Sequence, residues 1–107
     1  MEKIYYAQGD LIIKPAKIPA EVKEKKDGII AEGEASGHLH RLSPRQVKSG
    51  DAILFVSPQG MMFVRVKSQE AIIEHDSHAD IVLPQGDYEV GKQIEWDQIA
   101  GIRKVMD

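Results

Sequence analysis

Short apolar runs between closely spaced turn residues are the feature that most restricts how this chain can fold. Residues 11–13, 52–56 and 81–83 form runs that are too short for typical helices but have the usual length of strands. Glycine, proline and aspartate lie between these runs, and they supply the backbone angles and local hydrogen bonds of tight turns. The pattern predicts a mostly β protein, built as a small single-domain β-barrel or sandwich.

Individual strands follow from the same pattern. The clearest prediction is a hairpin in which residues 52–56 and 61–66 are joined by the loop 57–60, with proline and glycine at turn positions. Residues 88–96 alternate between apolar and polar side chains, as in a strand with one buried face. Residues 20–27 favour a helix or an exposed loop, and residues 99–105 fit either a strand or a helical turn. The other predicted strands are residues 3–7, 11–13, 29–31, 71–74 and 81–83, the last of which is expected to end at a turn over 84–87.

Length and composition restrict the class of protein. A chain of 107 residues suits one domain, residues 1–107, and 42% hydrophobic residues suffice for a small core. The net charge of -3 argues against a nucleic-acid partner, because phosphate binding depends on clustered Lys and Arg. No run approaches the ~20 apolar residues of a membrane span, and no secretory signal is recognised, so a cytoplasmic protein without a membrane partner is expected. Because so small a core often pairs with a second copy, we expect a homodimer.

Four histidines, all that the chain contains, form two close pairs. His38 and His40 are two residues apart, so in a strand both side chains point to the same side. His75 and His78 are three residues apart around two turn-forming residues, which suits a loop. The chain has no cysteine, so a metal would need imidazole and carboxylate ligands. The histidines therefore predict a site for one divalent transition metal, which could be Zn²⁺, Ni²⁺, Fe²⁺, Mn²⁺ or Cu²⁺.

Neighbouring residues leave other chemistry open. Additional metal ligands could come from Glu34, Asp76 and Asp80. Residues 78–80 have the His-x-Asp form of the facial triad of non-haem iron oxygenases, but no further histidine follows residue 78. No serine stands in the Gly-x-Ser-x-Gly frame of a hydrolase nucleophile. Proton transfer or anion binding by the imidazoles, without a metal, stays open as an alternative.

Two resemblances extend this interpretation. The strand-borne pair His38 and His40, the later histidines and the turn Leu83-Pro84-Gln85-Gly86-Asp87 together resemble a reduced cupin, a jelly-roll β-barrel that holds one metal at its centre. The order departs from the cupin pattern, because residues 41–45 contain no glutamate and the later histidines precede the turn. This resemblance implies a cupin-like barrel with a central metal.

A second resemblance covers nearly the whole chain. Residues 31–42 and 74–90 are similar to a group of short, uncharacterised bacterial and phage-encoded proteins, in which the turn at 8–10 and the closing strand at 93–96 recur as well. The resemblance implies the same β architecture and a role for the histidine motifs, and it implies no activity.

The favoured function is a small cytoplasmic β-barrel protein that binds one divalent transition metal through His38, His40, His75 and His78. One alternative is a metal-dependent cupin-like enzyme with an open coordination position for water, oxygen or substrate. Another is a module for interaction or assembly without a metal, for example in a phage. The sequence names no substrate, so whether the protein is an enzyme stays open.

Overall fold

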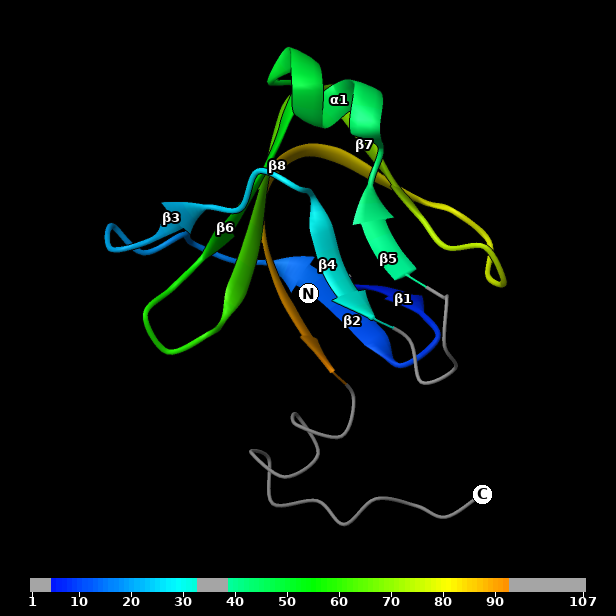
Figure 1. The fold of residues 1–107 in the computed structure, drawn as a ribbon, viewed down its shortest axis with the longest axis horizontal. Helices are drawn as coiled ribbons and strands as arrows, with labels where there is room; N and C mark the ends of the chain where they lie inside the picture. Colours follow the sequence, from blue (N-terminus) through cyan, green and yellow to red (C-terminus); the bar gives the residue numbers. More distant parts are fainter. Residues whose placement is uncertain (1–4, 33–38, 93–107) are drawn as a thin grey trace, which may run out of the picture.

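The computed structural model describes residues 5–32 and 39–92, which form one antiparallel sheet and a short helix (Figure 1). The elements are β1 (Tyr6–Gln8), β2 (Leu11–Pro15), β3 (Lys23–Glu24), β4 (Ile29–Glu32), β5 (Leu39–Leu42), α1 (Pro44–Ser49), β6 (Ala52–Val56), β7 (Met62–Glu74) and β8 (Ile81–Lys92). The prediction of a mostly β protein is confirmed. Residues 1–4, 33–38 and 93–107 lie outside the described part, and with them the ends of the predicted strands 3–7 and 88–96 and all of the segment 99–105.

Strand β7 organises the sheet, because it is long enough to serve two sets of partners. Residues 62–66 pair with β6, residues 73–74 pair with β5, and β8 lies beside β7 along both parts. A register shift between Val66 and Glu70 separates the two parts, and such irregularities bend a strand. The main strand order is β1-β2-β8-β7-β5-β4, with β6 beside β7 and β3 beside β6.

The strand order corrects the predicted architecture. Over residues 5–32 and 39–92 the sheet is not closed into a barrel, since β1 and β4 stand at opposite ends of the pairing order. All the described strands belong to one pairing network rather than to two sheets that face each other. The predicted barrel is therefore wrong for the described residues, and the cupin jelly roll is not confirmed.

Alternating burial along the strands builds the core and explains why one histidine lies inside it. In β8, Leu83 is completely buried, whereas its neighbour Val82 is 46% exposed. In β5, His40 and Leu42 are buried while Arg41 between them is exposed. His40 therefore occupies an inward position that an apolar side chain would usually fill. The largest fully buried side chains are Leu11, Ile13, Leu42, Leu54, Val64, Val66, Ile73 and Leu83.

The predicted turn at residues 84–87 is wrong, because β8 continues through it from Ile81 to Lys92. Pro84 pairs with Glu70 of β7, while β2 pairs only with residues 88–92 of β8. The proline thus lies where β8 has a partner strand on one side, which is where a strand tolerates a missing N–H. The turn on which the cupin resemblance partly rested is absent.

Two further local features differ from the sequence-based expectations. The helix α1 was not predicted; it begins with Pro44 in its first turn, and Gly50 ends it with φ 87°. Residues 20–27, expected to be a helix or an exposed loop, contain only the short strand β3 as regular structure. The hairpin of β6 and β7 agrees with the prediction. Among the described residues no helix has the length and apolar character needed to cross a membrane.

Candidate functional site

Three histidine rings lie next to one another, although they come from separate parts of the chain. His40 is in β5, and His75 and His78 are in the connection between β7 and β8. The ring centres of His40 and His75 are 4.4 Å apart, and those of His75 and His78 are 4.6 Å apart. The pairing of β5 with the end of β7 causes this approach, because Arg41 is opposite Glu74, the residue before His75. We call His40, His75 and His78 the histidine cluster.

The histidine cluster extends from the buried core to the surface of the protein. His40 is 2% exposed, the side chain of His75 is 4% exposed, and His78 is an exposed residue. The rings are tilted by 41° and 46° to their neighbours, so they do not form a parallel stack. A ligand from the solvent therefore meets His78 first.

Gln8, at the end of β1, connects the two histidine segments through its side-chain amide. The amide is buried, and its Nε2 donates hydrogen bonds to the carbonyl oxygens of Ile73, at 3.1 Å, and of Ala79, at 2.8 Å. Its Oε1 lies 2.8 Å from Nδ1 of His40. One side chain thus contacts β5, the end of β7 and the residue after His78.

Because Gly9 has no side chain, the rings of His40 and His78 can lie close to its backbone. A Cβ atom at this position would lie 2.9 Å from Nε2 of His78 and 3.6 Å from Cε1 of His40. Gly9 also has φ 63°, a conformation that favours glycine. The turn between β1 and β2 is therefore part of the site as well as a connection.

A backbone hydrogen bond determines which nitrogen of His75 carries a lone pair. The N–H of Ser77 donates to Nδ1 of His75 at 2.9 Å. Nδ1 is then the acceptor, and in the neutral ring the proton is on Nε2. For His75 to bind an ion through either nitrogen, Nδ1 has to release the N–H of Ser77, because a proton moved from Nε2 to Nδ1 would face that donor.

Ring spacing within the cluster is shorter than a shared tetrahedral ion requires. An ion about 2.0–2.1 Å from an imidazole nitrogen lies about 3.2 Å from the ring centre, so two rings that share it at the tetrahedral angle have centres about 5.2 Å apart. The observed spacings of 4.4 Å and 4.6 Å are below this value. In the described part of the chain, no three histidine, aspartate or glutamate side chains are already grouped as a metal site either. A shared ion therefore requires the rings to turn.

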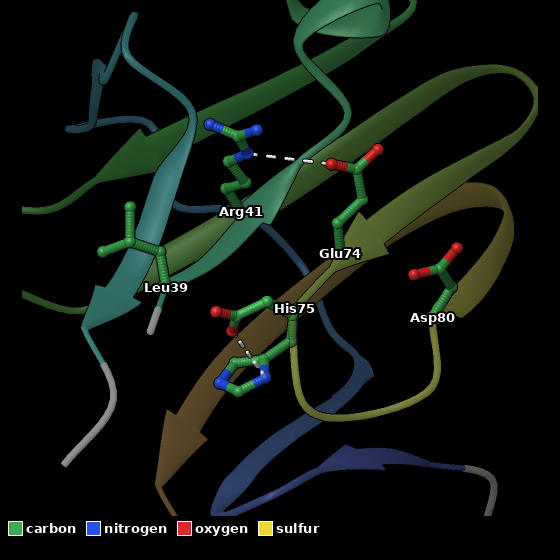
Figure 2. A pocket seen from close by; sticks show the side chains of 6 residues that line it. Leu39, Arg41, Glu74, His75 and Asp80 are labelled. Atoms are coloured by element: carbon green, nitrogen blue, oxygen red, sulfur yellow. Dashed lines mark ion pairs between the residues drawn. The ribbon is translucent and has the colours of Figure 1, made fainter. Parts of the chain in front are cut away.

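A cleft of about 430 Å³ adjoins the histidine cluster on the side of His75 (Figure 2). Arg41 lies beside Glu74 there, with 3.7 Å between Nε and Oε1. Three carboxylates against one guanidinium make the lining negative. The residues that line the cleft are Leu39, Arg41, Glu74, His75, Asp76 and Asp80.

The structure brings together some of the predicted site residues and not others. The rings of His40, His75 and His78 lie next to one another. Two of the three carboxylates predicted as ligands, Asp76 and Asp80, line the adjoining cleft. His38 and Glu34 lie outside the described residues. Sequence reasoning missed Gln8 and Gly9 as site residues, because no local signal distinguishes them from an ordinary turn.

A comparison with protein families covers most of the chain. The model of a family described as "Domain of unknown function (DUF8820)" matches residues 7–93. The chain belongs to the DUF8820 family. No curated protein and no solved structure matches it.

Membership in the DUF8820 family confirms the predicted relation to uncharacterised proteins. The matched part of the DUF8820 domain contains Gln8, Gly9 and all four histidines. The match shows neither a phage origin nor a histidine motif, and the description assigns no activity. What the histidine cluster does is therefore argued from its geometry.

Proposed function

We propose that this protein binds one divalent transition metal ion at the histidine cluster, with His40 and His78 as ligands. The observation that carries the proposal is the convergence of three imidazole rings from β5 and the β7–β8 connection. Imidazole nitrogen suits Zn²⁺, Cu²⁺, Ni²⁺ and Fe²⁺. With no cysteine in the chain, imidazoles are the strongest ligands that it offers to these ions.

Exposure and hydrogen bonding divide the roles within the cluster. His40 is held by Gln8 and forms the fixed end of the site. His78 is exposed and can turn toward an ion at small cost. His75, whose Nδ1 accepts the N–H of Ser77, becomes a third ligand only after it breaks that bond. His38 stays the sequence-based candidate for a further ligand.

The adjoining cleft favours a version of the site with an open coordination position. Its carboxylates attract cations, and a negatively lined concavity raises the local concentration of a positive ligand. The volume of about 430 Å³ is within the usual range for small-molecule sites. A metal-dependent enzyme is therefore the second candidate function.

The expected homodimer stays a prediction that sedimentation velocity can check.

Metal analysis of protein purified without an affinity tag tests the proposal. We expect saturable binding of one Zn²⁺ or Co²⁺ per chain in calorimetric titration, and visible absorption of bound Co²⁺ that reports nitrogen ligands. His78→Ala should weaken binding by about 10-fold or more, because the site loses a direct ligand. Gln59→Ala, an exposed change in the loop between β6 and β7, is the control and should bind as the wild type does.

Two results would overturn the proposed function. One is the absence of saturable binding for every divalent ion tested. The other is binding that is unchanged in both His40→Ala and His78→Ala, which would place the ion elsewhere.

Gly9→Ala offers a steric test of the same site. The new methyl group would lie 2.9 Å from Nε2 of His78, so we expect the ring to be displaced and the metal affinity to fall by about 10-fold. Gly60→Ala is the matched control, because Gly60 also has a positive φ, 90°, but has nothing within 4 Å of the added Cβ. Both variants should lose stability through backbone strain, by about 1 kcal/mol. Equal metal affinity in the two variants would contradict the proposed place of His78.

A further inference from the structure

We infer that Gln8 is the positioning residue of the histidine site, and that its amide holds His40 in the tautomer whose Nε2 can bind a metal. The inference deepens the proposed metal function and rests on it for one of its two readouts. It depends on the direction of three hydrogen bonds, all made by one buried side chain.

The orientation of the Gln8 amide follows from its partners. Both groups near Nε2, the carbonyls of Ile73 and Ala79, can only accept hydrogen bonds. The NH₂ end of the amide must face them, and its two hydrogens are then both used. The oxygen end is therefore turned toward His40.

The tautomer of His40 follows in turn. An amide oxygen accepts and cannot donate, so the 2.8 Å contact places a hydrogen on Nδ1 of His40. In the neutral ring Nε2 then carries the lone pair. Metal-binding histidines usually have this arrangement, in which the other ring nitrogen donates to a carbonyl or carboxylate oxygen.

Gln8 also holds β5, which carries His40, close to the segment that carries His75 and His78. Ile73 is two residues before His75, and Ala79 directly follows His78. The bond to Ile73 holds the end of β7 against the end of β1, and the bond to Ala79 holds the β7–β8 connection there. The third bond holds His40 of β5 in the same place. Glutamate could accept from His40 but could not donate to the two carbonyls, and leucine could do neither.

The first experiment measures the tautomer of His40 in the metal-free protein by long-range ¹H–¹⁵N NMR at about pH 8, where an ordinary imidazole is neutral. We expect Nδ1–H in the wild type and a shift of the population toward Nε2–H in Gln8→Leu. Nε2–H in the wild type would overturn the inference, and so would an unchanged tautomer in Gln8→Leu. Because the wild-type spectrum decides by itself, the test holds even if Gln8→Leu does not fold.

The second experiment compares metal affinity in matched variants. Gln8→Leu should bind Zn²⁺ about 10- to 100-fold more weakly than the wild type, as expected when the partner of a ligating histidine is lost. Gln8→Glu keeps an acceptor for Nδ1 of His40 and should bind Zn²⁺ more tightly than Gln8→Leu does. Gln46→Leu is the control, because the amide of Gln46 makes a similar bridge, to the carbonyl of Glu70 and the N–H of Ile72, away from the cluster. This control should lower thermal stability but leave both the affinity and the tautomer of His40 unchanged.

The two readouts separate this inference from the proposed function. Nδ1–H in His40 without saturable Zn²⁺ binding would end the proposed function and, with it, the positioning role in a metal site. Saturable binding that depends on His40 but is equally strong in Gln8→Leu would overturn the role of Gln8 and leave the proposed function intact.

Discussion

Replacing His40 with alanine is expected to lower the affinity for a divalent transition metal by at least about 100-fold, the largest effect of any single change in the histidine cluster. His40 is the buried end of the cluster, and Gln8 holds its ring in a fixed orientation. His78 is exposed, so a neighbouring residue or water can replace it more easily. Calorimetric titration of Zn²⁺ into wild type and variant measures the difference.

His40→Ala should also destabilise the fold, and this effect has to be separated from binding. Without the imidazole, Oε1 of Gln8 is left in the interior with no ring to donate to it, which costs about 1–3 kcal/mol. Leu42→Ala is the matched control, because Leu42 is the next inward residue of β5 and is 1% exposed. It should lose about 2–5 kcal/mol of stability and, while folded, keep the metal affinity of the wild type. Equal affinities in His40→Ala and Leu42→Ala would contradict the proposed role of His40.

Leu83→Ala is expected to lower the free energy of unfolding by about 2–5 kcal/mol, because it leaves a cavity at a completely buried position. Leu83 lies opposite Ala71, which is itself fully buried and too small to fill the space. Val82→Ala, the next position on the same strand, changes a side chain that is 46% exposed and should cost less than about 1 kcal/mol. Urea denaturation followed by circular dichroism compares the two variants. A similar loss in both would mean that β8 does not present these faces to core and solvent as described.

Local patterns of the sequence predict much of the strand content, and the reasons are visible in particular segments. The hairpin of β6 and β7 is predicted because its loop and both apolar runs lie within a few residues of each other. The run through Pro84 and Gly86 has the composition of a turn, yet it continues as β8, because β7 pairs with it and β2 does not reach it. Helix α1 has only six residues and none of them is buried, so the sequence has no apolar periodicity there that would predict a helix.

Only the part of the candidate site that depends on neighbouring residues was predicted from the sequence. The spacing of His75 and His78 suits a loop, and the structure places both in the connection between β7 and β8. That His40 meets them depends on the antiparallel pairing of β5 with the end of β7. The role of Gln8 depends on contacts to residues 32, 65 and 71 positions away in the chain. No periodicity or turn preference reports contacts of that range.

The sequence by itself determined that the chain forms short strands, where its best hairpin lies, and that imidazole is the ligand type it offers to a metal. These properties follow from alternation and turn chemistry, which act over a few residues. Only the tertiary structure decided that the sheet stays open over the described residues and that His40 joins His75 and His78. It also decided that Oε1 of Gln8 lies 2.8 Å from Nδ1 of His40, the contact from which we infer the tautomer. These features depend on the order in which distant strands pair, and that order is set by the packing of the whole core.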